Sequence, residues 1–171
     1  MGTKMNDQLT TSDIQRMQEE IEYRKVTLRK ELLESVKETR AHGDLSENFE
    51  YHAAKKEKNK NESRIRYLER MIRSAQVIED HSAEDEVGVN NTVEVLFEED
   101  QAVETYKIVT TVRGDSLHNL ISLESPLGKA LMGHRKGDRV EVQVNDAIHY
   151  PVRIQKIDKT TDESEDKIRK F

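Results

Sequence analysis

The chain has 171 residues, of which 34% are hydrophobic, 5% aromatic and 36% charged, with a net charge of −6 and no tryptophan. This composition is too lean for one large core and too patterned for disorder, so it favours a solvated helical element joined to a small globular unit. The absence of cysteine excludes a disulfide framework, thiolate metal ligands and a thiol nucleophile. We find neither the apolar core of a signal peptide nor an apolar run of membrane length, and we therefore expect a cytoplasmic protein.

Charge is distributed unevenly along the chain. Ten acidic residues and no lysine or arginine lie between Glu79 and Glu104, whereas basic residues outnumber acidic ones between positions 47 and 73. A net-acidic protein is a poor non-specific binder of nucleic acid, so any contact with DNA or RNA is expected to be local.

A long first helix is predicted from Ser12. Residues 1–11 are polar and aperiodic, and we expect them to be loosely ordered. Ser12 and Asp13 are typical of a helix start, and apolar residues then recur at spacings of three, four or their sum. These residues are Ile14, Met17, Ile21, Leu28, Leu32 and Val36, and no glycine or proline interrupts them before Gly43.

A second helix, running towards Gln76, has a more regular pattern. The seam positions Tyr51, Ala54, Lys58, Asn61, Ile65, Leu68, Ile72 and Ala75 alternate spacings of three and four, which is a coiled-coil heptad register. The polar seam positions, Lys58 and Asn61, would cost stability and fix the register. Two arms of about 28 residues would each be roughly 40 Å long. The pattern predicts an antiparallel helical hairpin, and a spacer or dimerisation hairpin remains an alternative reading.

The tip of this hairpin carries two carboxylates, Asp44 and Glu47. Gly43 permits the sharp reversal, and Ser46 is placed to cap the second helix. Two carboxylates are too few for a resident Mg²⁺ site, so they would complete a site on another molecule. The alternative is that they only cap the helix and favour its dipole. Nearby basic residues, Arg40 and Lys55 among them, would either steer a phosphate backbone or form a solvated, salt-bridged face.

Beyond the hairpin the pattern changes to short strands. Segments 92–97, 105–112 and 140–144 alternate with period two, and 120–123 and 150–157 are further candidates. Ser125 to Gly133 predicts a short helix with Ser125 as N-cap, Pro126 as its first residue and Gly133 after its end. We therefore predict an α+β chain: a hairpin at 1–78, a linker at 79–88, a mostly antiparallel β-domain with one helix at 89–158, and a mobile polar tail at 159–171.

No independent active site is evident from the sequence. The glycines at 128, 133 and 137 lack the strand–loop–helix spacing of a phosphate-binding loop, and no Ser-His-Asp or Cys-His arrangement can be identified. We therefore expect a protein that is not itself an enzyme and has no resident cofactor.

Two long motifs resemble the signatures of one family. Residues 40–55, RAHGDLSENFEYHAAK, are similar to the first signature of the bacterial Gre transcript cleavage factors, and the chain is closest to the GreA type. Residues 125–133, SPLGKALMG, followed by the Lys136-Gly137-Asp138 turn, are similar to the second. The likeness extends from about Leu9 to Ile157.

The resemblance implies a coiled-coil hairpin and a C-terminal domain of FKBP-like fold. It implies that the globular domain docks at the rim of the RNA polymerase secondary channel, through the matching residues Ser125, Pro126, Leu127, Gly128 and Gly133. The hairpin would enter the channel, where Asp44 and Glu47 would help to hold a Mg²⁺ ion jointly with the polymerase and stimulate cleavage of backtracked RNA 3′ ends. The residues that fall beside the RNA are Ser46, Asn48, Phe49, Arg40 and Lys55. We expect the free protein to be a monomer with no membrane partner.

Some positions depart from the family pattern, and other functions remain open. Phe49 stands where the family usually has a small residue, and Asp13 where a glycine is common. A relative that enters the same channel as a regulator or inhibitor, without stimulating cleavage, is the alternative function. Such relatives typically alter the tip carboxylates, which Asp44 and Glu47 retain. A prolyl isomerase would need an aromatic pocket, and this region offers only Phe97, Tyr106, Tyr150 and Phe171.

Overall fold

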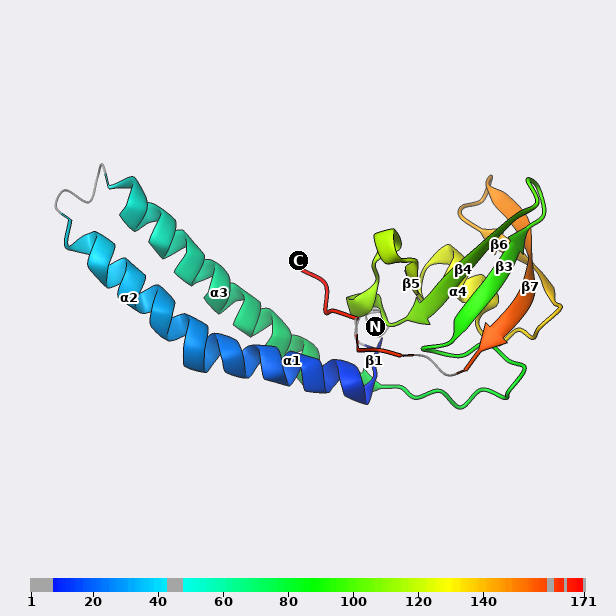
Figure 1. Ribbon diagram of the computed structural model, residues 1–171, viewed down its shortest axis with the longest axis horizontal. Helices are drawn as coiled ribbons and strands as arrows, with labels where there is room; N and C mark the ends of the chain where they lie inside the picture. The colour runs from blue at the N-terminus through cyan, green and yellow to red at the C-terminus, as the bar shows by residue number, and fades with distance from the viewer. Residues whose placement is uncertain (1–7, 43–47, 160–161, 165, 171) are drawn as a thin grey trace. The chain divides into compact units, whose positions relative to one another are not determined.

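The structure is a computed structural model that describes residues 8–42, 48–159, 162–164 and 166–170 (Figure 1). The chain divides into two compact units: Ser12–Ala75, and Met1–Thr11 together with Gln76–Phe171. The predicted α+β architecture is confirmed, because the first unit is a helical hairpin and the second holds a sheet with a short α-helix. No helix among these residues is long and apolar enough to cross a membrane.

The hairpin has two helical arms that lie side by side. The first arm consists of α1 (Thr11–Tyr23), a π-helical turn (Arg24–Leu28) and α2 (Arg29–Arg40), which follow one another without a break. The second arm is α3 (Phe49–Arg73), which runs back beside the first (Figure 1). The sequence pattern predicted both arms but not the π-helical turn.

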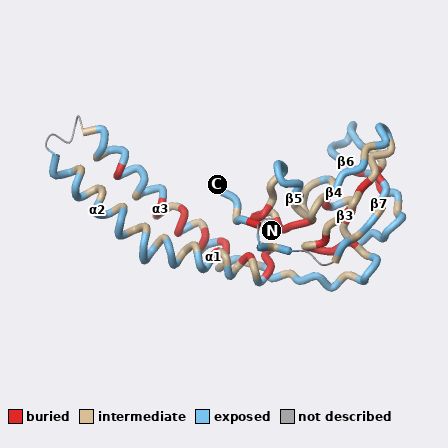
Figure 2. Tube along the Cα trace, viewed as in Figure 1, coloured by how far each residue is buried: buried red, intermediate tan, exposed pale blue. Residues whose placement is uncertain are grey.

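The seam between the arms is only partly apolar. Met17 and Leu68 are fully buried, whereas α2 contains no buried residue at all (Figure 2). A bidentate contact between Arg29 and Glu62, at 2.7 and 2.9 Å, joins the two arms where apolar packing is thin. The arms are therefore held together by apolar contacts in some places and by ion pairs and hydrogen bonds in others.

Glu20 lies at the centre of one such polar contact. Its carboxylate accepts hydrogen bonds from Arg24 Nε at 2.7 Å and from Arg64 Nε at 2.8 Å. Burial by itself would raise the pKa of Glu20, but the hydrogen bonds and charges of Arg64 and Arg24 outweigh burial and leave that pKa below its usual value. Glu20 is therefore held in its charged form in the folded hairpin.

The N-terminal segment was expected to be loosely ordered, and for its described part this is wrong. β1 (Gln8–Leu9) pairs in parallel with β2 (Gln76–Val77), and the Leu9 side chain is fully buried. Ile78 N–H continues the pairing by donating to Leu9 O at 2.9 Å. Two-residue strands are too short to show the alternation by which a strand is recognised in sequence.

The globular unit is built on a five-stranded sheet of order β5-β4-β3-β7-β6. The strands are β3 (Thr92–Phe97), β4 (Ala102–Val109), β5 (Leu120–Ser122), β6 (Arg139–Gln143) and β7 (His149–Asp158). All neighbours are antiparallel except β4 and β5, which pair in parallel, and the β3–β7 register shifts between Glu94 and Val95. The predicted strand at 105–112 ends early, because residues 111–113 form a 3₁₀ turn.

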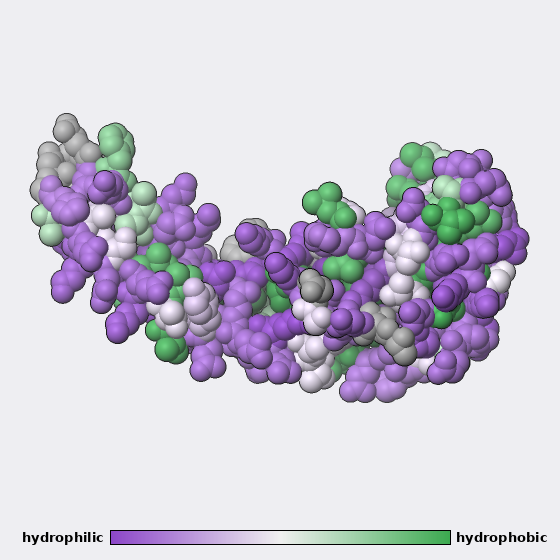
Figure 3. Space-filling view, in the orientation of Figure 1, coloured by the Kyte–Doolittle hydropathy of each residue, from purple (hydrophilic) through white to green (hydrophobic). Residues whose placement is uncertain are grey.

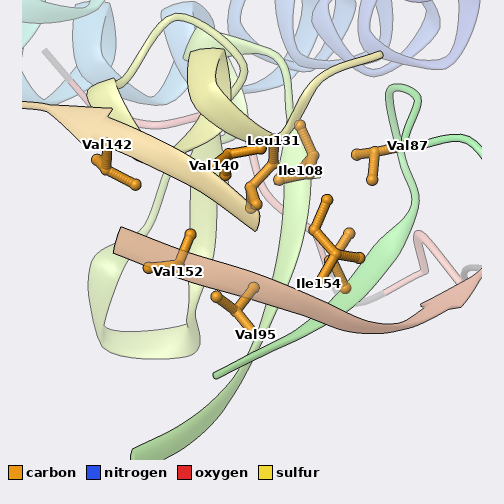
Figure 4. Close-up of a cluster of buried hydrophobic side chains, with 9 residues drawn as sticks. Val87, Val95, Ile108, Leu131, Val140, Val142, Val152 and Ile154 are labelled. Atoms are coloured by element: carbon orange, nitrogen blue, oxygen red, sulfur yellow. The ribbon is translucent and has the colours of Figure 1, made fainter. Parts of the chain in front are cut away.

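Inward-facing side chains of the sheet form the core. Val93 and Val95 of β3 alternate with less buried residues, as Val140 and Val142 do in β6. Figure 4 shows these side chains gathered with those of β7 and with Leu131, which comes from the helix α4 (Pro126–Leu131). The surface of both units is mostly hydrophilic in the view of Figure 3.

The described part of the C-terminal tail, which was expected to be mobile, is attached to the globular unit. The Asp166 carboxylate accepts hydrogen bonds from Arg113 Nη1 at 2.9 Å and from Lys107 Nζ at 2.9 Å. Arg113 is fully buried and Asp166 is 8% exposed. A composition-based reading treats a charged segment as solvated, and it does not detect a carboxylate that neutralises a buried arginine.

Candidate functional site

The end of the hairpin is closed by Asn48. Its Nδ2 donates to Thr39 O at 2.5 Å, at the end of α2, and its Oδ1 accepts Tyr51 N–H at 3.0 Å, at the start of α3. Asn48 therefore adds a second hydrogen bond to Thr39 O, which also accepts His42 N–H at 3.2 Å, and satisfies the Tyr51 amide, which has no partner within its own helix. This side chain ties together the described ends of the two arms.

Asn48, rather than Ser46, is the N-cap of α3, which begins at Phe49. The prediction that Ser46 caps the second helix is therefore wrong. Asparagine is as favourable as serine at an N-cap, and the sequence offers both within three positions. Spacing does not separate the two, because the residue three positions on is Phe49 in one case and Tyr51 in the other, and neither is the Glu or Gln of a capping box.

Several of the predicted tip residues lie outside the described residues. These are Gly43, Asp44, Ser46 and Glu47, so their roles stay predictions. The adjoining residues are described, and Phe49 is 85% exposed. The side chains of Arg40 and Lys55 are both exposed.

The described surroundings of the tip carry little internal charge pairing. Arg40 and Lys55 make no ion pair with any residue that the structure describes, and His42 Nδ1 lies 3.7 Å from Glu50 Oε2 in an exposed pair. An exposed pair of this kind contributes little to stability. Within the described ranges, no group of three or more histidine or acidic side chains is arranged to hold a metal ion.

The second predicted motif forms α4, and its predicted capping is confirmed. Ser125 Oγ accepts Gly128 N–H at 3.1 Å and donates to Ser122 O at 2.6 Å, and Pro126 occupies the first turn. Gly133 follows the helix with φ at +78°, in the left-handed region that favours glycine. The motif is thus a helix fixed at both ends by residue types that the sequence shows.

Gly128 is required by close packing. A β-carbon at this position would lie 2.1 Å from Ser122 O and 3.0 Å from the Leu123 Cα. Both are backbone atoms, so a side chain cannot be accommodated by a rotamer change. Leu127, by contrast, packs partly buried against the core.

An open groove of about 420 Å³ runs along the exposed side of α4. Pro126, Lys129 and Ala130 line it from the helix, and Glu141 and Gln143 line it from β6. This groove brings part of the predicted docking motif to the surface. Of the five residues predicted to dock, Pro126 lines the groove, whereas Gly128 and Gly133 shape the helix and its end.

Comparison with known proteins gives consistent matches for both units. Residues 7–77 match the family model described as "Transcription elongation factor, N-terminal", and residues 82–159 match "Transcription elongation factor, GreA/GreB, C-term". The chain is 43% identical over 137 residues to transcription elongation factor GreA of Thermoanaerobacter pseudethanolicus, covering 80% of this chain and 87% of that protein.

Two further similarities concern a curated relative and a solved structure. GreA of Geobacillus kaustophilus is 42% identical over 144 residues, covering 84% of this chain and 91% of that protein. The crystal structure of GreA factor homolog 1 of Thermus thermophilus is 27% identical, covers 88% of this chain and 97% of that one, and aligns with a TM-score of 0.40.

Proposed function

The chain belongs to the GreA/GreB family and is a Gre-type transcription elongation factor, and from this premise we propose how it acts. The end of its hairpin enters the secondary channel of RNA polymerase and stimulates the polymerase's own cleavage of backtracked RNA 3′ ends. The protein supplies residues to the polymerase active centre and has no active site of its own. Because its proposed partner is a bacterial RNA polymerase, the proposal also implies a cytoplasmic location. We propose separately that the free protein is a monomer.

The observation that carries this proposal is the construction of the hairpin end. Asn48 ties Thr39 O to the start of α3, so the segment that contains Asp44 and Glu47 leaves from two fixed points. α3 has 25 residues and spans about 38 Å at 1.5 Å per residue. A tip carried on arms of this length can reach a centre buried well inside a larger molecule.

Asp44 and Glu47 are the proposed metal-completing residues. Carboxylate oxygens suit Mg²⁺, which is bound in proteins by one or two carboxylates with water and phosphate oxygens as its other ligands. Phosphodiester hydrolysis at a two-metal centre needs a held cation and a positioned water. The two carboxylates would supply ligands to one such cation, and Ser46 would lie beside the water. No resident cofactor is part of the proposal.

The residues beside the tip suit a nucleic-acid partner. Arg40 and Lys55 have no ion-pair partner among the described residues to neutralise them, so their charges are available to RNA phosphates. The exposed ring of Phe49 offers a surface on which a base can stack. Docking would use the exposed side of α4, including Pro126.

Cleavage of RNA in purified, backtracked elongation complexes tests the proposal. Wild type should release short 3′ fragments, whereas Asp44→Ala and Glu47→Ala should not, although both variants should still compete with wild type for the polymerase. Lys170→Ala, a change at an exposed position in the tail, is the matched control and should behave as wild type. Competition without cleavage by wild type would identify a regulatory relative, and full cleavage by Asp44→Ala would refute the metal assignment.

A further inference from the structure

The first arm contains one irregular turn, and a buried side chain of the second arm contacts it. Arg24–Leu28 is π-helical, and Arg24 O accepts the backbone N–H of Arg29 rather than that of the residue four positions on. Asn61, 3% exposed, approaches the same carbonyl, to which its Nδ2 donates at 3.2 Å. Its Oδ1 accepts a hydrogen bond from Arg24 Nη1 at 3.0 Å.

Both functional groups of the buried amide thus bond to one residue of the other arm. An amide at this heptad position replaces an apolar side chain, which costs stability and favours one register. A side chain that enters the helical hydrogen-bond ladder is also a recognised cause of local distortion. The contact therefore accounts for both the polar seam residue and the irregular turn.

The turn decides which way α2 faces. A π-helical turn closes its hydrogen bond over one residue more than an α-helical turn. Residues that follow it are rotated by about 100° relative to an uninterrupted α-helix. α2 carries this rotation to Thr39 and Arg40, from which the tip begins. α2 has no buried residue of its own, and the contacts described above that join it to the second arm are those of Arg29 with Glu62 and of Thr39 O with Asn48.

We propose that Asn61 is a positioning residue that holds the π-helical turn at Arg24–Leu28 and thereby sets the orientation of the tip. This inference rests on the proposed cleavage function for its consequence, but its structural part does not. Asn61 lies about three helical turns along α3 from its first residue, Phe49, so it does not touch the RNA or the metal. It acts through the backbone of Arg24.

Three substitutions separate the effect of the hydrogen bond between Asn61 Nδ2 and Arg24 O from the effects of the other contacts of these two residues. Asn61→Leu removes both hydrogen bonds and restores an apolar heptad residue. Asn61→Asp keeps the volume and the acceptor for Arg24 Nη1 but loses the donor to Arg24 O. Arg24→Gln, the matched control, removes the guanidinium with its hydrogen bonds to Glu20 and Asn61 Oδ1 and keeps the carbonyl that Asn61 contacts.

Spin labels measure the orientation of the arms directly, because the chain has no cysteine of its own. Labels on Glu34→Cys and Arg66→Cys, both at exposed positions, should give one narrow distance distribution in the wild-type background and in Arg24→Gln. The distribution should shift or broaden in Asn61→Leu and Asn61→Asp. Thermal unfolding should show that Asn61→Leu is at least as stable as wild type.

Cleavage kinetics give the functional readout. With either Asn61 variant, the rate at saturating factor should fall on the order of tenfold or more, while the concentration for half-maximal effect stays within about twofold of wild type. An unchanged distance distribution or an unchanged saturating rate in the Asn61 variants would overturn the proposal, as would an equal effect of Arg24→Gln. If wild type itself stimulates no cleavage, the proposed function fails, and the spin-label distances still decide whether Asn61 holds the turn.

Discussion

Replacing Gly128 by alanine is expected to destabilise the globular unit by about 3 kcal/mol, at the upper end of the range for overpacking. The added β-carbon would lie 2.1 Å from Ser122 O. That oxygen cannot move freely, because it already accepts hydrogen bonds from the amide and the hydroxyl of Ser125 at 3.0 and 2.6 Å. Relief of the clash must therefore displace either α4 or its N-terminal cap.

Gly133→Ala provides the comparison. Gly133 has a φ of +78°, and a β-carbon added to it would have no atom within 4 Å, so alanine there is strained but does not clash. We expect a cost of about 1 kcal/mol for this change. Urea unfolding followed by NMR at the amides of β3 and β7 reports the globular unit alone. An equal or smaller cost for Gly128→Ala would refute the packing argument.

Three further changes test the hairpin and the tail. The hairpin's free energy of unfolding should be greatest above the ordinary Glu pKa of 4.5 and should fall as acid protonates Glu20 through its lowered folded pKa. Circular dichroism of Glu20→Gln should show a weaker pH dependence, and an unchanged acid transition would contradict the role of Arg64. Asn48→Ala should cost about 1 kcal/mol and increase hydrogen exchange in the first turn of α3, and unchanged exchange would show that the cap is dispensable. Asp166→Ala should destabilise the globular unit by about 3 kcal/mol, because it removes a partner of the buried Arg113, and urea unfolding indistinguishable from wild type would show that the tail is not anchored there.

Residues whose role is local were predicted well from the sequence. The α4 helix follows from Ser125 and Pro126, because capping and the fixed φ of proline depend on neighbours in the chain. The strands β3 and β6 were predicted from a local signal as well. Successive side chains of a strand point to opposite faces of the sheet, so apolar and polar residues alternate along the sequence. The family signatures around Asp44 and Pro126 identified the family through their residue order.

Features that depend on distant parts of the chain were missed. Asp166 reads as a solvated acid until Arg113 is seen beside it, 53 positions earlier. The strand at Leu9 exists only because Val77 lies next to it. Asn61 was recognised as a polar seam residue. Its contact with Arg24 and the π-helical turn were missed, because both depend on how the two arms pack against each other.

The central claim is that the tip carboxylates supply ligands to the polymerase's Mg²⁺, and a Mg²⁺ titration of RNA cleavage in backtracked complexes tests it most directly. At saturating factor, wild type should lower the Mg²⁺ concentration that gives half-maximal cleavage, because Asp44 and Glu47 add ligands to the cation. Asp44→Ala and Glu47→Ala should leave that concentration where it lies without the factor. A wild-type protein that raises the rate equally at every Mg²⁺ concentration, with no change in the half-maximal value, would contradict the account.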